Sequence, residues 1–148
     1  MRMICNGCFQ VYDSRLINQK DGEYICPLSN CRGSLDTIDE LLLPTLIMLI
    51  KKGYLPKYSS SGHCPPLSEN PWVDTYLAFD ELCAPDCENL PKGFEVEKKP
   101  DTVVICKTHD TDNEKTLFFS LLDTAKDLYL WADSLNDGLL ASLVKTDR

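Results

Sequence analysis

Two stretches of the chain carry apolar residues at helical spacing. Residues 38–50 are apolar nearly all round, which predicts a helix that is buried on most sides. Thr37 and Glu40 have the spacing of a capping box at its start, and Gly53 suits the position just after its end. Pro44 either kinks this helix or begins a second helix in its first turn.

A second helix is predicted in the last third of the chain. Asp112 or Asn113 can cap its start, and Gly138 ends it. One more turn is expected at residues 139–144. The apolar positions form one broad stripe: Phe118, Leu121, Leu122, Ala125, Leu128, Tyr129, Ala132 and Leu135.

Between the two helices, the composition and the alternation of apolar and polar residues predict strands. They cover residues 54–58, 72–79, 94–97 and 102–107, and Pro56 restricts the first of them to a sheet edge. Helices that flank a run of strands indicate an α+β fold, with the helices on one face of a largely antiparallel sheet.

Residues 1–35 have a different pattern, built around two cysteine pairs. Cys5 and Cys8 form the first pair, and Cys26 and Cys31 form the second. This spacing is typical of a zinc ribbon, a β-hairpin fold with two metal-binding knuckles. Gly7 suits the tight first knuckle, residues 11–12 and 15–17 supply strand residues, and Lys20-Asp21-Gly22 has the chemistry of a hairpin turn. We therefore expect a ribbon at 1–35 and a second domain at 36–148.

Four thiolates would fill the tetrahedron around a zinc ion and leave no open position for water. One structural Zn²⁺ is therefore expected at Cys5, Cys8, Cys26 and Cys31. The alternative is four ordinary buried thiols, because free cysteine packs as a small hydrophobic residue. Four residues separate the second pair, so its knuckle should form a wider loop.

The remaining cysteines allow two interpretations. Cys83 and Cys87, completed by Cys106 and by Cys64 or His63, could form a second zinc site, or all could be ordinary thiols.

A basic n-region with an apolar stretch and cleavage site is not visible at the start, and the longest apolar run, 41–50, is too short to span a membrane. Eight cysteines in such a chain indicate reduced thiols or metal ligands in a cytoplasmic protein.

The chain is acidic, with a net charge of −8. Residues 1–36 sum to zero, so the second domain carries the whole imbalance. This charge disfavours direct binding to nucleic acid and favours a protein partner with a basic surface. Lysine and arginine are missing between Lys57 and Lys92. The candidate partner-binding residues in this stretch are Asp80, Glu81, Asp86 and Glu88.

One turn offers an alternative function. Ser61-Gly62-His63 could serve a small enzyme that acts on a nucleotide or a modified RNA base, although the same residues also suit a polar turn. Gly-rich phosphate loops, nucleophile elbows and His-Glu-x-x-His sites are missing from the sequence. We therefore expect a non-catalytic protein. The acidic charge favours an interaction protein over a transcription-linked ribbon that contacts nucleic acid.

Residues 39–63, from Asp39-Glu40-Leu41-Leu42-Leu43-Pro44-Thr45 through Lys52-Gly53-Tyr54 to Ser61-Gly62-His63, resemble a segment of small proteins from Gram-positive bacteria and their phages. There the segment often follows a four-cysteine ribbon, and cysteines precede the Ser-Gly-His turn where this chain has Ser59 and Ser60. The Ser-Gly turn is also similar to one in the wybutosine-biosynthesis methyltransferases. In size and charge the chain is similar to anti-CRISPR proteins, which implies a phage inhibitor of a nucleic-acid-handling protein in the host cytoplasm.

Overall fold

The computed structural model describes residues 2–5, 7–8, 10–38, 40–62, 72–111 and 113–141. The chain divides into two compact units, Met1–Glu40 and Leu41–Arg148. The first unit extends to residue 40 because a strand at its end pairs with the first strand of the chain. The α+β architecture predicted from the sequence is confirmed, with hairpins in the first unit and an antiparallel sheet with two helices in the second.

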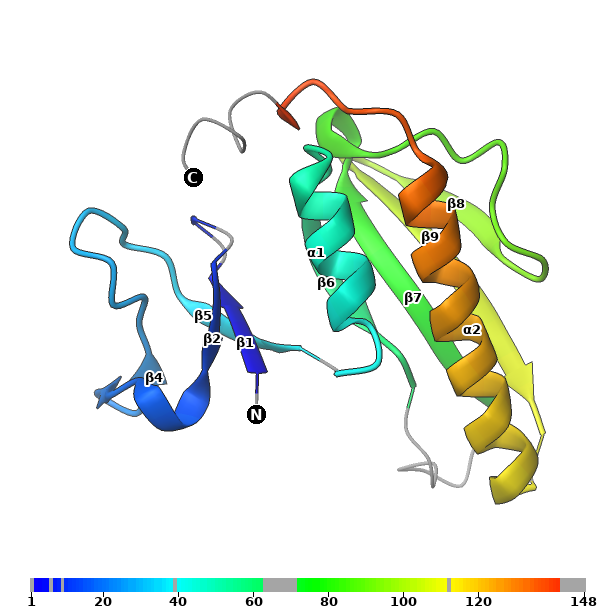
Figure 1. Ribbon diagram of the computed structural model, residues 1–148, viewed down its shortest axis with the longest axis horizontal. Helices are drawn as coiled ribbons and strands as arrows, with labels where there is room; N and C mark the ends of the chain where they lie inside the picture. The colour runs from blue at the N-terminus through cyan, green and yellow to red at the C-terminus, as the bar shows by residue number, and fades with distance from the viewer. Residues whose placement is uncertain are drawn as a thin grey trace. The chain divides into compact units, whose positions relative to one another are not determined.

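The first unit contains a three-stranded antiparallel sheet and a separate hairpin (Figure 1). The sheet has the order β2-β1-β5, formed by β1 (Arg2–Cys5), β2 (Val11–Asp13) and β5 (Leu35–Ile38). The hairpin consists of β3 (Gln19–Lys20) and β4 (Glu23–Tyr24). Asp21 and Gly22 join its strands with φ angles of 52° and 80°. Positive φ at both central residues is what a type I′ turn requires, so the predicted Asp-Gly hairpin is confirmed.

Two expectations near this unit are wrong. Residues 15–17 were expected to form a strand, but the 3₁₀ helix η1 (Ser14–Leu16) lies there, capped by the Asp13 side chain, which accepts a hydrogen bond from the Arg15 backbone N–H. Thr37 does not cap a helix, because it lies in β5 opposite Met3 of β1. Strand pairing across the unit outweighs the local helix signal at residues 37–40.

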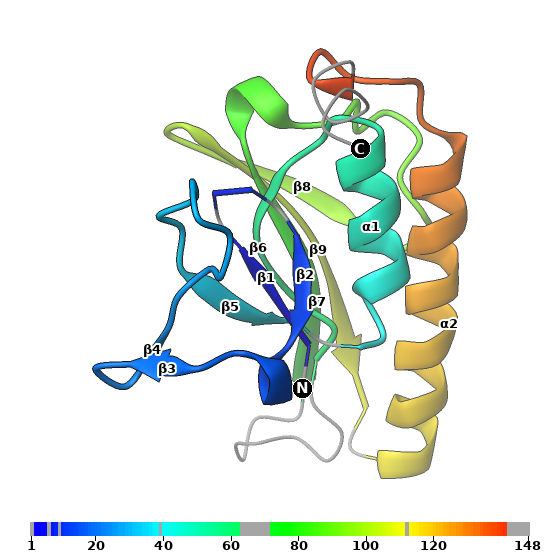
Figure 2. The ribbon, with the colours of Figure 1, turned by 60° about the vertical axis from the view of Figure 1, so that its left-hand side comes forward.

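The second unit is a four-stranded antiparallel sheet with the order β6-β7-β9-β8. Its strands are β6 (Pro56–Ser60), β7 (Trp72–Asp80), β8 (Glu95–Lys99) and β9 (Thr102–Asp110), and the short 3₁₀ helix η2 (Glu81–Cys83) follows β7. Helices α1 (Leu43–Lys51) and α2 (Glu114–Ser134) lie side by side on one face of this sheet (Figures 1 and 2). The predicted edge position of the strand with Pro56 is confirmed.

Helix α1 begins at Leu43 with Pro44 in its first turn, so the proline starts the helix and does not kink it. At the other end, the Gly53 backbone N–H donates to the Ile50 carbonyl and the Tyr54 N–H donates to the Leu49 carbonyl. These two bonds form a Schellman motif, with Gly53 at the left-handed position, φ 86°. The expected role of Gly53 is confirmed.

Helix α2 is capped by Asn113, whose side chain accepts a hydrogen bond from the Thr116 N–H. The stripe predicted for it is only partly right. Leu121, Ala125, Leu128 and Ala132 are buried, but Phe118 and Tyr129 are exposed, and the buried face is completed by Leu117, Thr124 and Trp131. The helix is apolar on more than one side, so periodicity alone cannot say which side faces the sheet. Among the described residues, no helix has the length and apolar character needed to cross a bilayer.

Candidate metal centre

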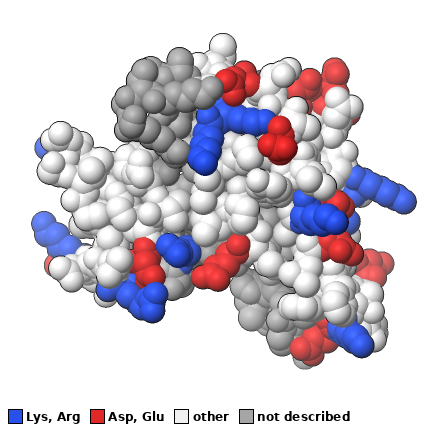
Figure 3. Space-filling view, in the orientation of Figure 1, with Lys and Arg blue, Asp and Glu red and all other residues white. Residues whose placement is uncertain are grey.

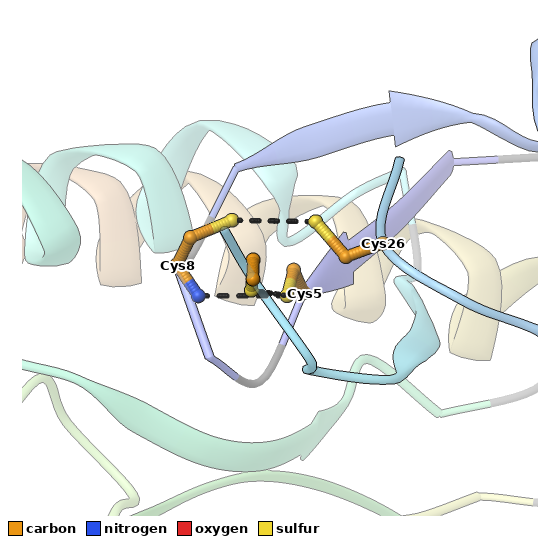
Figure 4. A group of neighbouring side chains, drawn as sticks. Cys5, Cys8 and Cys26 are labelled. Carbon is orange, nitrogen blue, oxygen red and sulfur yellow. Dashed lines mark hydrogen bonds between the residues drawn. The ribbon is translucent and has the colours of Figure 1, made fainter. Parts of the chain in front are cut away.

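The four cysteines of the first unit meet in a single cluster. Their Sγ atoms all lie within 4.8 Å of one another. The Cys5 and Cys31 sulfurs are 3.5 Å apart, and those of Cys8 and Cys26 are 3.6 Å apart. Figure 4 shows the Cys8 and Cys26 side chains pointing toward each other across the cluster. Residues far apart in the sequence are therefore brought together as the spacing of the two pairs predicts.

Short loops position the sulfurs. Cys5 ends β1 and Cys8 lies in the turn that follows, while Cys26 comes just after β4. The first knuckle closes with a hydrogen bond from the Cys5 N–H to the Gln10 carbonyl, 3.0 Å. In the second knuckle, the Cys31 N–H donates to the Leu28 carbonyl, also 3.0 Å. The wider second loop expected from the spacing is thus closed by a turn of its own.

Backbone amides donate hydrogen bonds to sulfurs of the cluster. The N–H groups of Gly7 and Cys8 lie 3.3 and 3.4 Å from the Cys5 Sγ, and the Gly33 N–H lies 3.4 Å from the Cys31 Sγ. Such donors stabilise negative charge on sulfur, as a thiolate ligand requires. The Tyr12 hydroxyl, 3.4 Å from the Cys26 Sγ, adds a side-chain contact of the same kind.

Gly7 is needed in the first knuckle because of space. Its φ angle is not positive, so an L-residue could adopt its backbone conformation. A Cβ atom at this position would lie 3.0 Å from the Cys31 Sγ and 3.3 Å from the Gly33 Cα. The glycine expected from the sequence therefore lets the second knuckle approach the first.

The cluster shifts the acidity of its own thiols. Burial raises the pKa of Cys5, and burial together with the sulfurs of Cys26 and Cys5 raises the pKa of Cys8 to about 12. Burial also acts to raise the pKa of Cys26, but hydrogen bonds from the Tyr12 hydroxyl and the Leu28 backbone outweigh it and lower that pKa to about 7. The thiols of Cys5 and Cys8 therefore resist losing their protons beside the other sulfurs unless a cation lies among them.

The geometry fits a tetrahedral ion. A metal–sulfur bond of about 2.3 Å places the sulfurs of a tetrahedral site about 3.8 Å apart. The observed separations of 3.5 and 3.6 Å, with all four atoms inside 4.8 Å, bracket that value. Cys5 and Cys26 are buried, and Cys8 and Cys31 are half-buried. The cluster could hold one metal ion.

Those of the other cysteines that the structure describes do not form a comparable group. Among the described residues, the only cluster of potential ligands is the one at Cys5, Cys8, Cys26 and Cys31. Cys83, Cys87 and Cys106 are half-buried, and Cys64 and His63 lie outside the described residues. Burial raises the pKa of Cys83, Cys87 and Cys106, and nearby carboxylates add to the increase in each case. These thiols therefore favour the protonated form.

The turn proposed for the enzyme alternative is held by packing and hydrogen bonds where it is described. Ser61 is buried, and its carbonyl accepts a hydrogen bond from the Thr75 hydroxyl at 2.9 Å. Gly62 has φ 91°, and a Cβ there would lie 2.4 Å from a methyl carbon of Val73. The described part of the turn therefore has a structural explanation.

A polar chain that the sequence did not reveal passes through His109. Its Nε2 lies 2.8 Å from the Thr75 hydroxyl and its Nδ1 lies 2.7 Å from the Ser120 hydroxyl. The Thr75 proton goes to the Ser61 carbonyl, so Nε2 must carry the proton that bridges to Thr75, and Nδ1 accepts from Ser120. Burial lowers the pKa of His109, aided by Lys107 and opposed by Asp74. Alternation along β9 with Val103 and Ile105 is the only sequence signal for this buried position.

The predicted partner-binding carboxylates lie at and after the end of β7. Asp80 caps η2 by accepting from the Leu82 N–H, and it lies 3.8 Å from the Lys57 ammonium. Asp86 accepts from the Glu88 N–H, while Glu81 and Glu88 are exposed. Two of the four carboxylates therefore also hold local turns. On the face shown in Figure 3, acidic and basic side chains are interspersed.

Comparisons with known proteins do not assign the chain to a family. No protein-family model matches the chain, and no curated protein or solved structure is significantly similar to it. The resemblance of residues 39–63 to small bacterial and phage proteins is therefore without support from these searches. What can be said of the metal centre follows from its geometry.

Proposed function

We propose that the first unit binds one Zn²⁺ through Cys5, Cys8, Cys26 and Cys31, and that the ion holds this unit folded. The observation that carries the proposal is the grouping of four sulfurs within 4.8 Å, all supplied by the protein. A four-sulfur tetrahedral donor set suits zinc, and four protein ligands leave no position for water or substrate. Among the residues of this unit whose burial is described, the buried apolar ones are few, Met3 and Leu35 beside the cysteines, so ligand bonds supply stability that this core lacks.

Metal analysis of the purified chain tests this proposal. About one zinc per chain is expected, and Cys26→Ser should lose it. Cys106→Ser is the matched control, because it removes a thiol from the second unit and should keep the metal. About two zinc ions per chain would point to a second site with Cys64, Cys83, Cys87 and Cys106. A chain purified without chelators that takes up no zinc would contradict the proposal.

We further propose that the chain acts without catalysis, by binding a protein partner with a basic surface through the acidic loop, the segment that carries Asp80, Glu81, Asp86 and Glu88. Its support is the charge of −8, which lies outside residues 1–36, and the exposure of Glu81 and Glu88. Opposite charge steers association and makes it sensitive to salt. In a finer form of this proposal, the partner handles nucleic acid, and the carboxylates imitate phosphates so that the chain inhibits it in the manner of anti-CRISPR proteins.

The partner proposal is tested by capture from a lysate of the encoding organism at low and high salt. The test variant carries Asp80→Asn, Glu81→Gln, Asp86→Asn and Glu88→Gln, in which the amide oxygens can still cap the local turns. A control variant with Glu95→Gln, Glu97→Gln, Asp123→Asn and Asp127→Asn has the same net charge. A basic protein should be lost from the test variant and retained by the control.

Equal retention by both variants would contradict docking through this loop. The finer form is tested by adding duplex DNA or RNA to the captured complex. Nucleic acid should release the partner if it occupies the same surface, and a complex that withstands excess nucleic acid would argue against phosphate mimicry.

A further inference from the structure

The outer side of α2, away from the sheet, is unusually apolar. Phe118, Phe119, Tyr129 and Leu130 are 49%, 53%, 38% and 54% exposed. The helix already buries a full stripe against its own unit, so these side chains are in excess of what the fold requires. Figure 1 shows α2 in front of the sheet, with no other helix or strand of the second unit over this outer side. A group of exposed aromatic and aliphatic side chains on one helix indicates an interaction surface.

Six residues of the outer side, Phe119 and Tyr129 among them, follow heptad spacing. Positions separated alternately by four and three residues run along the whole helix: Lys115, Phe119, Leu122, Lys126, Tyr129 and Asp133. All of them are exposed or half-buried. Such a pattern is the seam along which two helices pack, and α2 is about 31 Å long at 1.5 Å per residue. We call these six residues the outer seam.

The outer seam is complementary to itself when two copies run antiparallel. With the twofold axis at the height of residue 124, Phe119 lies opposite Tyr129 of the second copy. Lys115 then lies opposite Asp133 of the second copy, so that two opposite-charge pairs close the ends of the seam. Near the axis, the aliphatic stem of Lys126 lies on Leu122 of the second copy while its ammonium reaches solvent. The aromatic residues therefore meet each other, Leu122 meets the aliphatic stem of a lysine, and each terminal charge meets its opposite.

The terminal charges are placed against the preference of an isolated helix. The negative end of a helix favours cations, and the Lys52 ammonium donates to the Asp133 and Leu135 carbonyls at the end of α2. The last turn itself has no basic residue, however, and contains the Asp133 carboxylate. Lys115 lies in the first turn, where the positive end disfavours it. Among the described residues, neither side chain forms an ion pair within the chain. Antiparallel pairing satisfies both, because each end of α2 meets the opposite end of its partner.

We propose that the chain forms a twofold-symmetric homodimer through antiparallel packing of α2 along the outer seam. The occupant of the apolar surface is therefore a second copy of the same chain. This inference concerns a surface of the second unit and is independent of the zinc site and of the acidic loop.

Light scattering after size exclusion, with about 100 µM full-length chain loaded, tests the proposal, since association with micromolar Kd is populated there. The expected mass is twice the 16.7 kDa of one chain. Lys115→Glu and Asp133→Lys should each weaken dimerisation by roughly tenfold, because each replaces two attractions with two repulsions. The double variant restores opposite charges and should dimerise to within a few-fold of the original chain.

Lys98→Glu and Glu95→Lys, on the exposed strand β8, are controls for the change in net charge and should leave the dimer unaffected. Circular dichroism of every variant should report unchanged helix content. The proposal is overturned by a monomeric original chain. It is equally overturned by a dimer that both single variants leave intact, or by a double variant that fails to recover.

Discussion

The Nδ1 atom of His109 lies 2.7 Å from the Ser120 Oγ, which connects β9 to α2. On the other side of the ring, Nε2 bonds to Thr75 on β7, whose hydroxyl donates to the Ser61 carbonyl. One continuous chain of hydrogen bonds thus joins two strands, a turn and a helix. When Ser120 donates to Nδ1, every hydrogen bond in this series can form only if the imidazole is neutral and carries its proton on Nε2.

Replacing Ser120 by alanine should destabilise the second unit. The substitution leaves the buried Nδ1 atom without its donor, at a cost of about 1–3 kcal/mol. Urea unfolding measures the loss. Ser134→Ala is the matched control, because its hydroxyl donates only to the Trp131 carbonyl at the end of the same helix. An equal loss of unfolding free energy in the two variants would show that the hydrogen bond to His109 contributes no more than that of Ser134.

The stability of the second unit should fall as the pH drops below about 6.5. Burial lowers the pKa of His109 in the folded protein, so the unfolded chain binds more protons in this range. The stabilisation from neutral His109 is complete above the unfolded pKa and is lost as the pH falls toward the folded pKa. Unfolding midpoints in urea at pH 7.5, 6.5 and 5.5 measure the trend.

His109→Gln provides the comparison for that measurement. Glutamine keeps a donor and an acceptor but does not titrate, so the difference in midpoint between the two proteins should narrow as the pH is lowered. Lys107 and Asp74, which also act on the ring, remain in both proteins. A constant difference over the three pH values would mean that His109 does not govern the trend.

Gly53 should tolerate alanine far less well than Gly22 does. Both have positive φ, 86° and 80°, so both substitutions incur the left-handed penalty of about 1–2 kcal/mol. Only at Gly53 would the new Cβ also meet backbone, 2.2 Å from the Ala141 nitrogen, whereas nothing lies within 4 Å at Gly22. Gly53→Ala should therefore lower the thermal midpoint of the second unit by several degrees more than Gly22→Ala lowers that of the first. Similar small shifts would mean that the segment around Ala141 moves aside.

Much of the fold follows from local pattern. The strands of the second unit, its two helices and the hairpin at Asp21 could be predicted because alternation, helical spacing and turn residues act within a few positions. The start of α1 could not be predicted in this way, because residues 35–38 pair with β1, whose residues lie 30 to 36 positions earlier in the chain. The local sequence pattern at residues 37–40 does not reveal pairing with a strand so far away in the chain.

The candidate site shows the same division. Cysteine spacing is enough to group four sulfurs, because ligand geometry restricts the loops that can present them. The hydrogen-bond partners of His109 could not be predicted from the sequence. Thr75 and Ser120 lie on separate elements, and no spacing motif marks either residue. The buried side of α2 was also ambiguous, because Phe118 and Tyr129 are as apolar as the residues that face the sheet.

The space at Gly7 gives the sharpest test of the metal centre's geometry. Alanine fits the local backbone, so any effect of Gly7→Ala must come from the new Cβ, which would lie 3.0 Å from the Cys31 Sγ. The knuckles would have to separate by a few tenths of an ångström, and we expect zinc affinity to fall by about 10- to 100-fold, as for other changes next to metal ligands. Competition with a chromophoric chelator measures that affinity. Asn30→Ala, an exposed change in the second knuckle, should leave the affinity unchanged. If Gly7→Ala binds zinc as tightly as the original chain, the close approach of the two knuckles does not limit the site.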